Sequence, residues 1–195
     1  MSSEEIFIEA VVRQRNDAVK TLYDRYAPAL LGLCCRYCTC REDAEDVLHE
    51  GFMKILKSLP TFRARTNGSL LAWMKRIMVN TALNHIRSRN RQIIPPAFTP
   101  EDTVADPSED PGFFEGILGK ISREGILAMI TSLPDGYRTV FNLYVFEEYS
   151  HREIAGLLNC TESTSKSQLS KARAMLRVKI DDALKQEKVS EYGKA

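Results

Sequence analysis

The amino-acid sequence predicts an all-α protein of two small helical domains joined by a flexible acidic linker. Three observations predict this fold. Apolar residues recur at i, i+3 and i+4 along most of the chain, whereas the alternation typical of a β-strand persists nowhere. The helical pattern stops between residues 92 and 120, where prolines and acidic side chains gather. A length of 195 residues and a hydrophobic share of 44% suit two small globular domains.

The first domain, residues 1–91, is predicted to begin its helices near Asp17. This helix places five large side chains on one face, namely Val19, Leu22, Tyr23, Tyr26 and Leu30. Pro28 should kink this helix or open a new turn, because proline removes a backbone donor.

A second helix is predicted over residues 41–59, with acidic side chains in its first turns, as the helix dipole favours. Its inward side chains are Ala44, Val47, Leu48, Phe52, Ile55 and Leu59. A loop over 61–68 follows, and then a long helix that runs from about Ser69, a plausible N-cap, to about Arg89. Trp73 is expected in the core, since it has apolar neighbours at i−3 and i+4.

The linker, residues 92–120, contains five prolines and a run of acids, so an extended and flexible segment is expected. The second domain, residues 121–184, opens with two short helices. The first ends at Pro134 and the second begins after it. A tail, residues 185–195, is polar and is expected to fray.

Residues 151–182 have the pattern of a helix-turn-helix, in which a short helix, a tight turn and a longer basic helix follow one another. The turn is 159–162, with Thr161 as N-cap of the last helix. Leu169, Ala172 and Leu176 form its inward stripe. An outer face of short polar residues between lysines lets a helix approach base edges, and here it holds Lys166, Ser167, Ser170 and Lys171.

Charge is sorted along the sequence, although the formal net charge is only +1. Residues 51–100 contain no acid and nine cations, and residues 163–180 contain no acid and five cations. Two separate basic windows suggest two surfaces that bind a polyanion. In the first window, one polar stripe recurs along the long helix at spacings of 4, 4, 3 and 4: Arg76, Asn80, Asn84, Arg87 and Arg91. The loop before it, with Arg63, Arg65, Asn67 and Gly68, could clamp an extruded base.

Five cysteines are present, four of them close together: Cys34, Cys35, Cys38, Cys40 and Cys160. An odd number favours free thiols that pack at a helix end. Metal binding or redox sensing is the alternative, but no Cys or His pair completes a familiar zinc spacing.

Three motifs in the right order resemble those of bacterial sigma factors, and the match covers residues 17–90 and 123–180. The segment DAEDVLHEGF at 43–52 resembles their polymerase-clamp-binding helix, and VNTALNHIR at 79–87 resembles their promoter-melting helix. The third resemblance, to their C-terminal helix-turn-helix domain, is carried by residues 133–141, 149–155 and 164–173. A linker in place of a middle domain is similar to the extracytoplasmic-function subfamily.

The resemblance implies a protein that binds core RNA polymerase, recognises promoter minus-thirty-five and minus-ten elements and promotes strand opening. It implies polymerase-binding roles for Asp43, Glu45, Asp46, His49 and Glu50. It implies minus-ten contacts from the stripe and its preceding loop, and minus-thirty-five contacts from Thr164, Lys166, Ser167, Ser170, Lys171 and Arg173. An anti-sigma factor is an implied partner.

Other classes of function are less well supported by the sequence. A free-standing helix-turn-helix regulator is the alternative, but it leaves the acid-free first domain unexplained. An enzyme is not expected, because the three histidines lie in separate elements and no phosphate loop, nucleophile elbow or HExxH pair is present. We expect no cofactor, no membrane insertion and a cytoplasmic location, since no apolar run approaches a membrane span and no signal peptide is recognisable.

Overall fold

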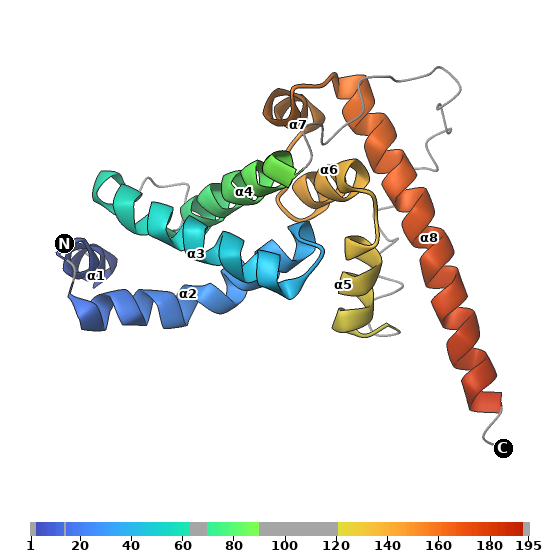
Figure 1. Cartoon of the computed structure of the whole chain (residues 1–195), viewed down its shortest axis with the longest axis horizontal. Helices are drawn as coiled ribbons and strands as arrows, with labels where there is room; N and C mark the ends of the chain where they lie inside the picture. The colour runs from blue at the N-terminus through green and yellow to red at the C-terminus, as the bar shows by residue number, and fades with distance from the viewer. Residues whose placement is uncertain (1–2, 14, 63–69, 90–120, 193–195) are drawn as a thin grey trace. The chain divides into compact units, whose positions relative to one another are not determined.

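The computed structural model of the protein describes residues 3–13, 15–62, 70–89 and 121–192. Every regular element in these ranges is a helix, so the predicted all-α class is confirmed. The chain divides into two compact units, Met1–Arg89 and Asn90–Ala195 (Figure 1). The predicted linker lies outside the described residues.

The first unit is built on three helices that pack against one another: α2 (Asn16–Tyr37), α3 (Arg41–Ser58) and α4 (Leu70–Arg89). A fourth helix, α1 (Ser3–Val12), contacts α2 and the short 3-10 helix η1 (Leu59–Thr61). Helix α1 was not among the elements predicted from the sequence.

The predicted inward face of α3 is confirmed, because all six of its residues are buried, including Leu59 in η1. Helices α3 and α4 approach closely at Gly51, where an added Cβ would lie 2.5 Å from the Sδ atom of Met78. A residue without a side chain is therefore what allows this approach.

Helix α2 includes Pro28 in its interior, so the helix does not end at the position where the sequence predicts a kink or a new turn. Pro28 is exposed, which leaves its ring free of the core. Trp73 is half-buried rather than in the core, with its ring centroid 5.0 Å from that of Phe62.

The second unit contains α5 (Arg123–Thr131), α6 (Asp135–Val145), α7 (His151–Leu158) and α8 (Glu162–Tyr192). Helix α8 contacts the other three helices, and α6 also contacts α7. The expected inward stripe of α8 is confirmed, since Leu169, Ala172 and Leu176 are buried. Helix α8 continues to Tyr192, into the tail for which the sequence predicts fraying.

A buried arginine joins α5 to α6. Arg138 is only 3% exposed, and its guanidinium donates to the carbonyls of Thr131 and Leu133, each at 3.0 Å. It also pairs with Asp135 at 2.5 Å. These bonds satisfy the carbonyl of Thr131 in the last turn of α5 and that of Leu133 just beyond the helix, neither of which has a partner within α5.

Candidate nucleic-acid interface

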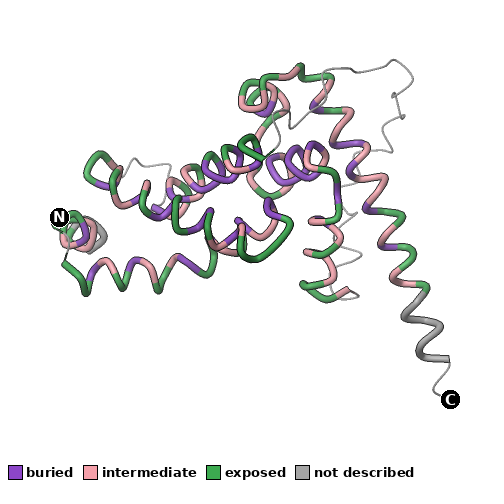
Figure 2. The backbone as a smooth tube through the Cα atoms, viewed as in Figure 1, coloured by how far each residue is buried: buried purple, intermediate pink, exposed green. Residues whose placement is uncertain are grey.

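The predicted polar stripe on α4 lies at the surface. Arg76, Asn80, Asn84 and Arg87 are all exposed, and Figure 2 shows exposed positions recurring along this helix beside a buried face. Arg87 donates to the Oδ1 atom of Asn84 at 3.1 Å, which orders the two side chains relative to each other. Asparagine and arginine side chains suit base edges and phosphates respectively.

The opposite side of α4 faces the rest of the first unit. Leu70, Met74, Met78, Ala82 and Ile86 are buried there. The helix is therefore fixed by one face and presents the stripe on the other.

Acidic residues on α3 differ in how they are engaged. Asp46 is exposed and Glu42 is exposed, whereas Glu45 pairs with Arg41 at 2.7 Å and Glu50 pairs with Lys54 at 2.6 Å. His49 is exposed, with Nδ1 3.0 Å from the carbonyl oxygen of Glu45. These exposed i, i+4 pairs contribute little to stability, so the groups can exchange partners readily.

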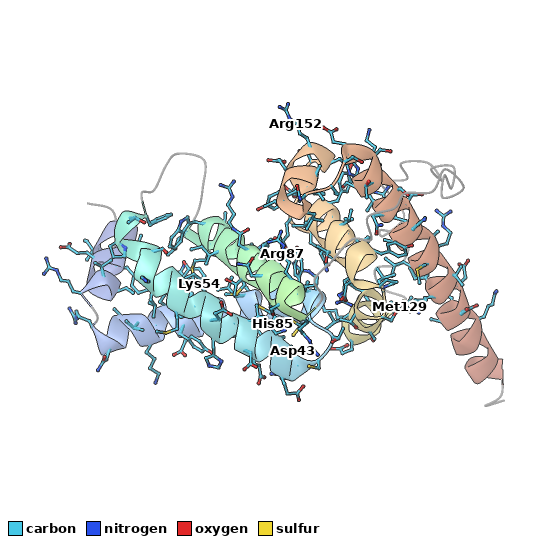
Figure 3. The ribbon with its side chains drawn as sticks, turned by 45° about the horizontal axis from the view of Figure 1, so that its top comes forward. Asp43, Lys54, His85, Arg87, Met129 and Arg152 are labelled. Atoms are coloured by element: carbon cyan, nitrogen blue, oxygen red, sulfur yellow. The ribbon has the colours of Figure 1, made fainter. Side chains whose placement is uncertain are left out.

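Asp43 is the exception among the predicted polymerase contacts, because its side chain is only 18% exposed. Its Oδ2 atom accepts a hydrogen bond from Arg89, and its Oδ1 atom lies 3.6 Å from Nε2 of His85. Figure 3 shows Asp43 and His85 together where α3 meets the end of α4.

One exposed residue on α3 was missed by the sequence analysis. Met53 is 67% exposed, and it follows His49 by four residues and Asp46 by seven. Those spacings place it on the same helix face as the two polar residues. The signal was present, since Met53 falls outside the predicted inward set.

The helix-turn-helix is closed by caps on both of its helices. Ser150 and Glu153 form a capping box at the start of α7, and Asn159 ends α7 in the left-handed conformation. Thr161 accepts a hydrogen bond from the backbone of Thr164 at 3.0 Å, which confirms it as the N-cap of α8. The sequence therefore fixes the turn through ordinary capping chemistry.

Six residues of α8 were predicted to contact DNA, and they differ in how far they are exposed. Lys166 is exposed, and Thr164, Ser167 and Lys171 are half-buried. Arg173 is half-buried as well, with its guanidinium 5.8 Å from the ring centroid of Tyr144.

The exposed position expected for Ser170 is wrong, since this residue is 8% exposed. Three helices contact α8, so its buried face is wider than the stripe of Leu169, Ala172 and Leu176. The small Ser170 side chain is accommodated within that buried face.

A second buried serine of α8 joins the two helices of the motif. Ser165 is fully buried, and its hydroxyl lies 2.8 Å from Nδ1 of His151 at the start of α7. The His151 ring stacks on Tyr144 with centroids 4.6 Å apart. This contact holds α7 against α8.

Four of the five cysteines sit around the end of α2. Cys34 and Cys38 are buried, Cys35 is half-buried and Cys40 is exposed, and all are free thiols. Burial raises the pKa of Cys34 to about 12, so this thiol stays protonated and is a poor metal ligand or nucleophile. Within the described residues no group of three or more His, Cys, Asp or Glu side chains could hold a metal ion.

Four predicted contacts to the minus-ten element, Arg63, Arg65, Asn67 and Arg91, lie outside the described residues. None of the helices that the structure describes is long and apolar enough to cross a membrane.

Comparison with known proteins accounts for both units. Residues 22–92 match the family Sigma-70 region 2, and residues 123–176 match Sigma-70, region 4. The RNA polymerase sigma-H factor of Pseudomonas aeruginosa is 30% identical over 190 residues, which cover 91% of each chain. The ECF RNA polymerase sigma-E factor of Haemophilus influenzae is 29% identical, with 91% of this chain and 95% of the relative covered. The chain belongs to the extracytoplasmic-function sigma factors.

The fold of the sigma factor also matches a solved structure. The sigma factor RpoE of Bartonella quintana, in complex with the anti-sigma factor NepR, aligns with a TM-score of 0.52 and 20% identity. The alignment covers 83% of this chain and 96% of that one. The family matches make the protein a transcription-initiation factor that recognises promoters for RNA polymerase. They account for the first unit, which a free-standing regulator leaves unexplained.

Proposed function

We propose that the sigma factor divides promoter recognition among three surfaces of described residues. The stripe on α4 captures unstacked bases of the minus-ten element, the exposed face of α3 binds the polymerase core, and α8 reads the minus-thirty-five element. The exposure of Arg76, Asn80, Asn84 and Arg87 is the observation that carries this proposal. The opposite face of α4 is packed in the core, so the helix is held in place. Its exposed polar, acid-free surface suits a single DNA strand whose bases have been unstacked.

The polymerase surface comprises Asp46, His49, Glu50 and Met53 on α3, with Glu45 at its edge. An exposed methionine between acidic groups supplies an apolar contact that a flexible side chain can adapt to. The acidic charges would orient the sigma factor on a basic surface of the polymerase and raise the rate at which the two proteins associate.

The minus-thirty-five surface comprises Thr164, Lys166, Ser167, Lys171 and Arg173. The caps and the His151–Ser165 contact support a rigid presentation of α8. We place this activity in the cytoplasm, where the chromosome is transcribed.

We also propose an anti-sigma partner for this chain, as the Bartonella quintana relative has in its solved complex. Such a partner would mask one of the three surfaces and compete with polymerase. A competition experiment tests this point: an anti-sigma partner should displace core polymerase from the purified sigma factor.

The test of the proposed function is run-off transcription with core polymerase and a genomic promoter library, with and without the protein. We expect a defined set of start sites that depends on the protein. Polymerase binding with no new start sites would instead make the protein a decoy, and specific duplex binding without polymerase would favour a free-standing regulator.

A further inference from the structure

Asp43 lies at the start of α3 but contacts the end of α4, 46 residues further along the chain. One carboxylate oxygen accepts from Arg89 and the other faces His85 at 3.6 Å. A hydrogen bond from the Cys40 thiol lowers the pKa of Asp43 below its ordinary value of 3.8, partial burial opposes this, and the charges of Arg89 and His85 lower it further. The carboxylate therefore remains charged beside the Arg89 guanidinium.

His85 and Arg89 are four residues apart, so they share one face of α4. At 100° per residue, that face is roughly opposite the stripe of Arg76, Asn80, Asn84 and Arg87. The contact with Asp43 thus holds one face of the last turns of α4, and the opposite face of the same turns carries Asn84 and Arg87.

We propose that Asp43 is a positioning residue that fixes the C-terminal turns of α4 for strand capture, and that it is not a polymerase contact. This inference rests on the proposed function. Its side chain is 18% exposed and both of its oxygens face α4. The neighbouring acid Asp46 is exposed on the outer face of α3 and remains suited to a partner.

The effect of the contact is orientation rather than global stability. Arg89 is 57% exposed, and pairs with one exposed member contribute little to the free energy of unfolding. However, fraying of the last turn of α4 would displace Asn84 and Arg87. The protein would then bind the DNA strand more weakly, although both side chains are still present.

A double-mutant cycle on the full chain tests the proposal. The variants are Asp43→Asn, Arg89→Gln and the double variant, with Asp46→Asn as the matched control on the same helix. Two affinities are measured: that of each variant for core polymerase, and that of each holoenzyme for a single-stranded oligonucleotide bearing the minus-ten element.

We expect Asp43→Asn to leave core affinity within about twofold and to weaken strand capture by about tenfold. Arg89→Gln should have the same effect, and the double variant should lose no more than either single variant, because both remove one contact. Asp46→Asn should instead lower the affinity for core polymerase. When it is combined with Arg89→Gln, the effects of the two substitutions on each measured affinity should be additive.

Loss of core affinity in Asp43→Asn to the extent seen in Asp46→Asn would overturn the proposal. So would strictly additive effects of Asp43→Asn and Arg89→Gln on strand capture. Thermal unfolding provides the structural control, since a shift of only a few degrees is expected, and loss of the folded state would show that Asp43 is a stability residue instead. If the unaltered protein fails to bind polymerase or the strand, it is the proposed function itself that fails.

Discussion

At the scale of single residues, burial separates side chains that bind a partner from those that build the scaffold. Asn80 and Arg138 are both polar, but Asn80 is exposed on a polar stripe and Arg138 is 3% exposed among carbonyls. The sequence predicted the exposure of Asn80, because helical spacing alone reveals a stripe. It could not predict the burial of Ser170 or the contact of Asp43 with Arg89, because both depend on which helices pack together.

Asn80→Ala should weaken capture of the minus-ten strand by about 1–3 kcal/mol, the usual contribution of a side-chain contact to a base. Lys75→Ala is the control, since Lys75 is a cation on the same helix but lies away from the stripe. Fluorescence anisotropy of the holoenzyme with a labelled oligonucleotide measures both. An unchanged affinity in Asn80→Ala together with a loss in Lys75→Ala would mean that binding there is only electrostatic.

Arg138→Met should destabilise the second unit by about 3 kcal/mol, because it leaves two carbonyls and Asp135 without their charged donor. Urea unfolding followed by circular dichroism measures the change. Arg123→Met, at an exposed position of α5, should change stability little. A loss below about 0.5 kcal/mol in Arg138→Met would show that water replaces the guanidinium.

At the scale of helices, the predicted elements were those with a clean apolar stripe. Helices α3, α4 and α7 match their predicted ranges closely because polar residues frame each stripe. Helix α1 was missed because nearly every position from Ile6 to Val12 is apolar, so no face can be distinguished. The extension of α8 could have been found from propensity, since Ala, Leu, Lys, Gln and Glu dominate its last turns.

Helix α8 should meet DNA through Lys166, which is exposed in its first turns. Lys166→Ala should reduce the slope of log affinity against log salt for duplex DNA by about one phosphate contact. Lys185→Ala on the same helix is the control, because Lys185 lies near the far end and is 4.0 Å from Asp182. An unchanged slope in Lys166→Ala would remove this residue from the interface.

At the scale of the whole molecule, the two compact units carry the three proposed binding surfaces. Region 2 accounts for the first unit and region 4 for the second, so the order of surfaces along the chain follows the order of the family matches. Sequence patterns predicted this division because the composition changes abruptly between residues 92 and 120. The promoter sequence stays unpredicted, because base recognition depends on how α8 is seated in the groove.

The central claim is that the stripe on α4 opens the promoter, and permanganate reactivity of thymines in the minus-ten element measures it most directly. The comparison is between holoenzyme with the unaltered protein and holoenzyme in which Arg76, Asn80, Asn84 and Arg87 are all replaced by alanine. We predict reactive thymines with the unaltered protein, and unreactive thymines with the variant despite normal binding to core polymerase. Equal reactivity in the two holoenzymes would contradict the account.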